Sequence, residues 1–184
     1  MPSDDVTEVL RTAESVKPQV VVMDTDVPGF RVFQMAEDIA RVVDPISLLF
    51  LTSVARDGYI DEALRLRAGG MVTTTSEPNE VTAAIDSIAK RQRYFSPDVA
   101  SRLVAGDRRR TGNSLRTRGS TISTREHQVL RLIAHGMSKR SIAERLGLSV
   151  KTIDNHATSI MNKLDIHDRV NLARYAFREG LAEP

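Results

Sequence analysis

The chain has 184 residues, of which 41% are apolar, 27% charged and only 4% aromatic, and it contains no cysteine or tryptophan. The lack of cysteine excludes disulfides, thiolate metal sites and thiol catalysis, and the low aromatic content argues against an aromatic-lined groove. No apolar run approaches the roughly 18 residues of a membrane span, and the first residues do not resemble a signal peptide. We therefore expect one domain or two small ones, cytoplasmic and without a membrane partner.

The small net charge of +2 conceals an uneven distribution. Residues 1–89 carry 7 Lys or Arg against 15 Asp or Glu, residues 90–120 carry 9 against 2, and residues 121–184 carry 10 against 7. An acidic front half joined to a basic rear half favours a polyanion as the partner of the rear half. Solvated surface charge is the plain alternative.

Residues 1–105 alternate between helical and strand periodicity. Helices are expected at 5–16, 31–43, 57–69 and 77–90, and short apolar strands at 18–23, 46–52 and 70–75. Asp5 and Glu8 are placed like a capping box at the start of the first helix. Short strands that alternate with helices indicate parallel βαβ units. The sequence therefore predicts an α/β domain at 1–105 with a partial doubly wound parallel sheet.

Apolar periodicity stops at Ala105, and the segment 106–120 combines glycines with a cluster of arginines, which is typical of a basic linker. Residues 121–184 then predict an all-α domain of four helices. The expected helices lie at 125–136, 139–147, 150–164 and about 168–179. Ser123 with Glu126 forms a capping box, Gly147 ends the second helix, and Ser149 caps the third.

The second and third helices, joined by a short turn, predict a helix-turn-helix. A helix from Ser149 to Lys163 is about 22 Å long, which is enough to cross a major groove of DNA. Asn can pair with adenine, Thr offers a hydroxyl, Lys neutralises phosphate, and the free amides at the helix N-terminus can receive a phosphate. A small bundle with a solvated face is the alternative.

The segment from about Ile122 to Leu181, which includes "STREHQVLRLIAHGMSKRSIAERLGLSVKTIDNHATSIMNKL", resembles the LuxR-type DNA-binding domain of NarL/FixJ-family response regulators. This resemblance implies a four-helix module that binds double-stranded DNA as a homodimer. The residues that it places at DNA are Lys139, Arg140, Lys151, Thr152, Asn155, Thr158 and Lys163, and the free amides at the start of the helix add Ser149. Those that it places at the dimer contact are Val170, Ala173, Arg174 and Phe177.

Asp154 stands where many members of that family carry lysine. It could accept a hydrogen bond from cytosine N4, or it could repel the DNA backbone and reduce non-specific affinity, and we favour the second interpretation. The four histidines, spread along separate helices, predict no metal site; they are His127, His135, His156 and His167.

Residues from about Asp5 to Val104 resemble the receiver domain of the same regulators, which has a flavodoxin-like fold. The resemblance places Asp24 at the phosphoacceptor position, Thr52 at the hydroxyl that contacts the phosphoryl group, and Pro28 and Gly29 in the following turn. It implies phosphorylation by a histidine kinase with Mg²⁺, which neutralises charge during phosphoryl transfer.

Three departures argue against that chemistry. The chain begins after the strand that carries the family's acidic pair, Thr74 stands in place of the lysine, and Met71 stands in place of the switch aromatic. We therefore expect a truncated, degenerate pseudo-receiver in which Asp24, Thr52 and Thr74 form a vestigial phosphoacceptor site. No catalytic residue and no cofactor are expected, with Mg²⁺ only if the receiver is active.

The missing first strand would leave "VVVMD" as an exposed apolar edge that dimerises, or that leaves the front half marginally folded alone. The leading hypothesis is a non-enzymatic, sequence-specific transcriptional regulator that works without phosphorylation. The alternative is a two-component response regulator phosphorylated on Asp24 by a histidine kinase. A protein–protein interaction module that never meets DNA is the third hypothesis.

Overall fold

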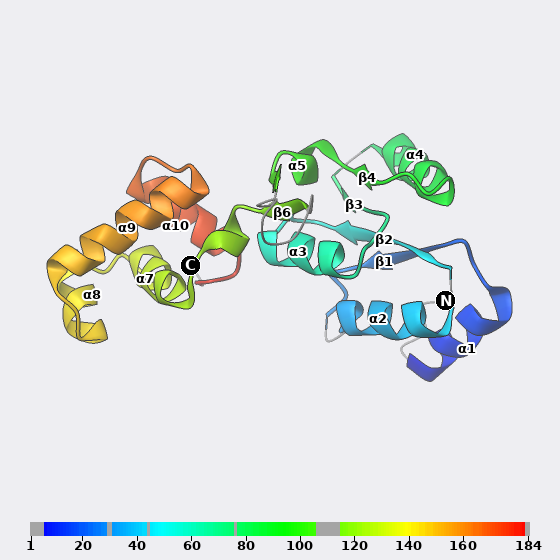
Figure 1. Cartoon of the computed structure of the whole chain (residues 1–184), viewed down its shortest axis with the longest axis horizontal. Helices are drawn as coiled ribbons and strands as arrows, with labels where there is room; N and C mark the ends of the chain where they lie inside the picture. The colour runs from blue at the N-terminus through cyan, green and yellow to red at the C-terminus, as the bar shows by residue number, and fades with distance from the viewer. Residues whose placement is uncertain (1–5, 29–30, 44, 76, 106–114, 183–184) are drawn as a thin grey trace. The chain divides into compact units, whose positions relative to one another are not determined.

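The structure is a computed structural model that describes residues 6–28, 31–43, 45–75, 77–105 and 115–182 (Figure 1). The chain divides into two compact units whose boundary lies near residues 103–104. The predicted combination of a parallel α/β part with an all-α helix-turn-helix part is confirmed. Among the described residues, no helix is long and apolar enough to cross a membrane.

The first unit is built on a parallel sheet of four strands in the order β1-β2-β3-β4. The strands are β1 (Val20–Asp24), β2 (Ser47–Thr52), β3 (Gly70–Thr73) and β4 (Tyr94–Phe95). The helices are α1 (Val6–Val16), α2 (Val32–Val42), α3 (Asp57–Arg65), α4 (Pro78–Ala89) and the short α5 (Pro97–Ala100). Strand β4 and helix α5 have no counterpart in the sequence prediction, because both are too short to show a period.

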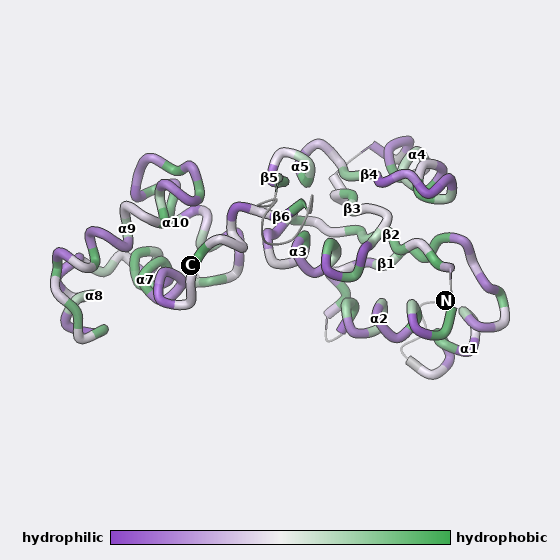
Figure 2. The backbone as a smooth tube through the Cα atoms, in the orientation of Figure 1, coloured by the Kyte–Doolittle hydropathy of each residue, from purple (hydrophilic) through white to green (hydrophobic). Residues whose placement is uncertain are grey.

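Successive residues of each strand point to opposite faces of the sheet. Helices cover both faces, so both sets of side chains have apolar neighbours. On one face, Phe50 and Met71 pack in a cluster with residues of α1, α2 and α3. On the other face, Leu49 and Val72 pack against Ala84 and Ile88 of α4. Figure 2 shows green and purple alternating along α2 and α4, as expected for helices with one buried side.

The outer edge of β1 has no partner strand among the described residues. Gln19 O accepts from Ser47 N at 3.0 Å and Thr25 N donates to Leu51 O at 2.8 Å, so the odd-numbered residues face β2. The amides and carbonyls of the even-numbered residues therefore point away from the sheet. Val22 lies in the middle of this edge and is 43% exposed. The predicted open apolar edge is confirmed, and dimerisation through it stays a prediction.

The second unit contains the four expected helices after a short 3-10 turn at Gly119–Thr121. They are α7 (Thr124–Ala134), α8 (Lys139–Leu146), α9 (Val150–Leu164) and α10 (Arg169–Arg178). Strands β5 (Leu103–Ala105) and β6 (Leu115–Thr117) form a two-stranded sheet. Part of the segment expected to be a linker thus has regular structure, while residues 106–114 lie outside the described residues.

The ends of these helices follow from local residue chemistry. Ser123 Oγ accepts from Glu126 N at 3.3 Å while Glu126 Oε2 accepts from Ser123 N at 2.7 Å, which confirms the predicted capping box. Gly147 ends α8 with a φ of +64°, a conformation that favours glycine. The capping box expected at Asp5 and Glu8 falls partly outside the described residues.

Candidate DNA-binding interface

Helix α9 presents one continuous exposed stripe of polar side chains. Lys151, Asn155, Thr158 and Asn162 are all exposed, and their spacing of four, three and four residues places them on one side of the helix. The opposite side is buried through apolar residues that include Ile153. Three of the residues predicted to contact DNA, Lys151, Asn155 and Thr158, therefore lie together, and Asn162 extends their row.

Ser149 and Thr152, also predicted as DNA contacts, form the N-terminal cap of α9. Ser149 Oγ accepts from Thr152 N at 3.0 Å and lies 2.8 Å from Thr152 Oγ1. Because the two hydroxyls bond to each other, they hold the first turn of the helix in place. Thr152 is half-buried, so it lies beside the exposed stripe rather than within it.

One flank of α9 is fixed by a buried carboxylate of α7. Glu126, only 4% exposed, accepts from Lys163 Nζ at 2.5 Å and from Ser159 Oγ at 2.7 Å. Burial alone would raise the pKa of Glu126, but hydrogen bonds from Lys163, the Ser123 backbone and Ser159 together lower it to about 2. Lys163, predicted to lie near phosphate, is therefore held mainly by Glu126 in this structure.

The other flank of α9 faces α8 through an ion pair. Lys139 Nζ lies 2.5 Å from Asp154 Oδ1, and the two side chains are 55% and 41% exposed. Arg140, also predicted to lie near phosphate, is 86% exposed and contacts Glu144 at 3.3 Å. Lys139 of α8 thus lies against α9 beside the exposed stripe, and Asp154 is not an isolated negative charge.

Sequence inspection missed the role of Glu126 in shaping this surface. The capping box identified Glu126 as a residue that begins α7, but its contact with Lys163 joins positions 37 residues apart. The Lys139–Asp154 pair was missed for the same reason. The opposite charges of Asp154 on α9 and Lys139 at the start of α8 are the signal that could have suggested this pair.

The four residues predicted at the dimer contact share one face of α10. Val170 is 63% exposed, Arg174 is exposed, and Ala173 and Phe177 are half-buried. Their positions i, i+3, i+4 and i+7 form a row along the helix. An apolar side chain as exposed as Val170 is the feature that a contact with a second copy would bury.

The residues of the expected vestigial phosphoacceptor site lie at the carboxyl ends of β1, β2 and β3. Asp24 is exposed, and its Oδ1 accepts from Asp26 N at 2.9 Å. Thr52 is fully buried and its hydroxyl donates to Val54 O at 2.9 Å. Thr74 is exposed and its amide donates to Thr52 O. The parallel sheet therefore brings these three positions to one edge, and their role as a phosphoacceptor site stays a prediction.

Two carboxylates of this region each accept a hydrogen bond from a backbone amide. Asp26 Oδ2 accepts from Ser53 N at 2.5 Å, so Asp24 and Asp26 are both occupied by nearby backbone amides. Within the described ranges, no three His, Cys, Asp or Glu side chains converge as metal ligands. Thr74 supplies a hydroxyl where a cation would balance phosphoryl charge.

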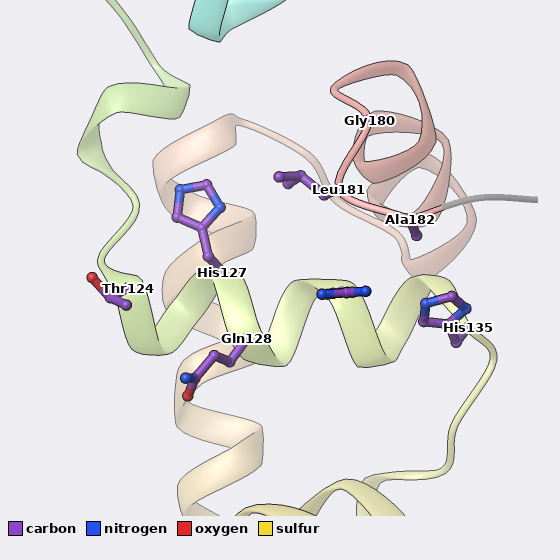
Figure 3. Close-up of a pocket in the computed structure, with 8 residues that line it drawn as sticks. Thr124, His127, Gln128, His135, Gly180, Leu181 and Ala182 are labelled. Carbon is purple, nitrogen blue, oxygen red and sulfur yellow. The ribbon is translucent and has the colours of Figure 1, made fainter.

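Figure 3 shows a hollow beside α7 that is lined by His127, Gln128, Arg131 and His135 and by residues 180–182. Contrary to the expectation of separate helices, His127 lies within α7 and His135 is its C-terminal cap. Eight residues correspond to about 12 Å along a helix, so these two imidazoles are too far apart to share a metal ion.

Comparisons with known proteins agree with this geometry. Residues 120–176 match the family model described as bacterial regulatory proteins, luxR family. The Fimbriae Z protein of Salmonella typhimurium is 30% identical over 174 residues, which cover 95% of this chain and 81% of that protein. The transcriptional regulatory protein LiaR of Bacillus subtilis is 29% identical over 97% of this chain and 84% of its own length.

Solved structures match in fold. A structure of two RcsB dimers bound to two parallel DNAs superposes with a TM-score of 0.61 and 22% identity, covering 95% of this chain and 82% of that one. A LuxR-family two-component response regulator from Aurantimonas sp. SI85-9A1 has a TM-score of 0.50 and 29% identity over 54% of this chain and 71% of its own. The arrangement of the two folds along this chain therefore has solved counterparts.

Proposed function

The chain belongs to the response-regulator family of DNA-binding transcription factors that carry a LuxR-type helix-turn-helix domain, and on that premise we propose that it is a sequence-specific transcriptional regulator. In this proposal it binds double-stranded DNA as a homodimer and does not require phosphorylation of Asp24. Its action is binding rather than catalysis. The single observation that carries the proposal is the exposed stripe of α9.

Three residues of the stripe have side chains that can contact DNA. Lys151 lies at the start of α9, where a cation can neutralise a phosphate, and Asn155 in the next turn can pair with the edge of adenine. Thr158 offers a hydroxyl one turn further along. Contacts on both flanks connect α9 to α7 and α8, so the stripe is presented on a helix that is already packed in place.

A homodimer is supported by the exposed row on α10 and by the related structure, which contains RcsB dimers on DNA. Two copies related by a twofold axis would place two α9 helices in successive major grooves. The preferred sites should then be inverted repeats whose half-sites are roughly 34 Å apart.

Independence from phosphorylation is supported by the surroundings of Asp24. Asp24 and Asp26 are both engaged by backbone amides, Thr52 donates to Val54, and Thr74 brings no positive charge. In this proposal the first unit serves assembly or another input. If Asp24 gains a phosphoryl group from a kinase or a small phosphodonor, the alternative of a two-component response regulator is supported instead.

The test is DNA binding by the full chain, measured by fluorescence anisotropy with duplex DNA in EDTA and without any phosphodonor. We expect affinity to fall steeply between about 50 and 200 mM salt, as phosphate contacts release counterions. Lys151→Gln should reduce the salt slope by about one. Lys90→Gln, which removes an exposed lysine at the end of α4, is the matched control and should leave the slope unchanged. Absence of salt-dependent binding would refute the proposal.

A further inference from the structure

One oxygen of the Asp154 carboxylate is covered, although the side chain as a whole is partly exposed. Oδ1 has almost no exposed surface and lies 2.5 Å from Lys139 Nζ. The side chain as a whole is still 41% exposed. Its exposed surface therefore belongs to its other side-chain atoms, which are Cβ, Cγ and Oδ2.

The partly exposed side chain of Asp154 lies next to the exposed stripe. Asp154 precedes Thr158 by four residues, so the two side chains are neighbours on the surface of α9. Asp154 and Thr158 also line one hollow of about 330 Å³ together with Lys139. A base edge that contacts Asn155 or Thr158 would consequently come within reach of Asp154.

The contact with Lys139 determines what Asp154 can do. Lys139 is the first residue of α8, whose start is fixed by Ser138 Oγ accepting from Ser141 N at 3.1 Å. The pair brings opposite charges together, so Asp154 does not project an unbalanced negative charge at DNA phosphates. Repulsion of the backbone, the interpretation favoured from sequence, needs such a charge. A carboxylate that is held in place has no hydrogen to donate, so it can only accept hydrogen bonds.

We propose that Asp154, held by Lys139, is a base-reading group that accepts a hydrogen bond from the N4 amino group of cytosine in the major groove. The inference rests on the proposed function. Guanine and thymine present oxygen acceptors where cytosine presents its amino group, so a carboxylate disfavours them. Adenine presents an amino group beside the N7 acceptor, which opposes the carboxylate, whereas cytosine has no acceptor beside its amino group.

The experiment selects binding sites from a random duplex library with the full chain and three variants. Asp154→Asn keeps the size of the side chain but adds donors, and Lys139→Met removes the cation that holds Asp154. Glu144→Gln is the matched control, because it removes one negative charge from the neighbouring helix and leaves the Lys139–Asp154 pair intact. The selected site and the same site with the proposed cytosine changed to thymine are then compared by anisotropy.

We expect the wild-type chain to select cytosine at one position of each half-site and to lose about tenfold in affinity on the change to thymine. Asp154→Asn should abolish that preference or move it to adenine, with which Asn pairs. Lys139→Met should weaken it, while Glu144→Gln should keep it and alter affinity at most uniformly.

Other outcomes separate this inference from the proposed function. If the wild-type chain binds DNA but the preference survives Asp154→Asn, the inference is overturned and the function stands. If Asp154→Asn raises affinity for every sequence equally, Asp154 acts by repulsion and the inference is also overturned. If the wild-type chain shows no salt-dependent DNA binding, the proposed function fails and the inference falls with it.

Discussion

Glu126 Oε2 and Lys163 Nζ lie 2.5 Å apart and connect the start of α7 to the last turn of α9. The carboxylate is almost fully buried, whereas the lysine side chain is 34% exposed. The same carboxylate also caps α7 through Ser123 and accepts from Ser159. One side chain thus fixes both the first turn of α7 and the orientation of the helix that bears the exposed stripe.

Replacing Glu126 with alanine should destabilise the helical unit by about 3 kcal/mol, because Lys163 and Ser159 lose their shared acceptor and the cap is broken. Glu144→Ala removes an exposed carboxylate whose ion pair is with exposed Arg140, so it should have little effect. Hydrogen exchange of peptides from α7 and α9 in the full chain checks both variants. Equal exchange rates in the two variants would show that the buried contacts do not stabilise this unit.

Acid should remove the contribution of Glu126 in a defined pH window. Its pKa is lowered from 4.5 to about 2 in the folded chain, so the folded state favours the ionised carboxylate. The stabilisation is therefore fully present above pH 4.5 and is lost as the pH falls toward 2. Thermal unfolding of the wild type and Glu126→Gln, followed by circular dichroism, should show a difference that shrinks across this window. A difference that persists unchanged down to pH 2 would contradict the prediction.

The ends of the helices were predictable from sequence, because the signals are local. Ser123 with Glu126, Gly147 and Ser149 each act within four residues, and the structure has all of them where expected. The strands β1 and β2 were predictable for a related reason, since their apolar runs are bounded by polar residues.

What could not be predicted depends on chain segments that meet only after folding. Strand β4 has two residues and exists because Tyr94 pairs with Gly70, where a Cβ would come within 2.0 Å of Tyr94 O. Likewise, Lys139 and Lys163 were assigned to phosphate from their positions alone. The structure joins each of them to a carboxylate, which changes what they are free to contact.

Incubation of the full chain with a small-molecule phosphodonor and Mg²⁺ should add no phosphoryl group. Asp24 lacks a converging set of metal ligands among the described residues, and Thr74 provides no cation to balance the incoming charge. Intact-mass measurement checks this, with Asp24→Ala as the control. A mass gain that disappears in Asp24→Ala would show that other groups supply the metal site and the charge.

Val170→Asp should weaken the homodimer by at least about tenfold, because it places a charge in the exposed apolar row of α10. Val170 is 63% exposed in the single chain, and Val16 on α1 is 67% exposed, so Val16→Asp is a matched control on a different surface. Sedimentation velocity over a range of concentrations measures the association of both variants. If Val16→Asp and not Val170→Asp gives monomers, the dimer contact lies on the first unit instead.

The open edge of β1 predicts that the first unit adds to self-association. Antiparallel pairing of two copies centred on Val22 would oppose Val22 to its counterpart and Val20 to Asp24, so the outward amides and carbonyls would bond in pairs. It would also bring the acidic end of one strand near Lys17 of the other. Val22→Lys should block this pairing and reduce concentration-dependent light scattering, with DNA binding retained.

Val42→Lys is the matched control for the edge, because Val42 is also 43% exposed but lies on α2 and not on the open edge of β1. It should leave the scattering unchanged. If both lysines reduce the light scattering equally, surface charge alone governs solubility. If neither changes it, the edge of β1 is covered in the full protein.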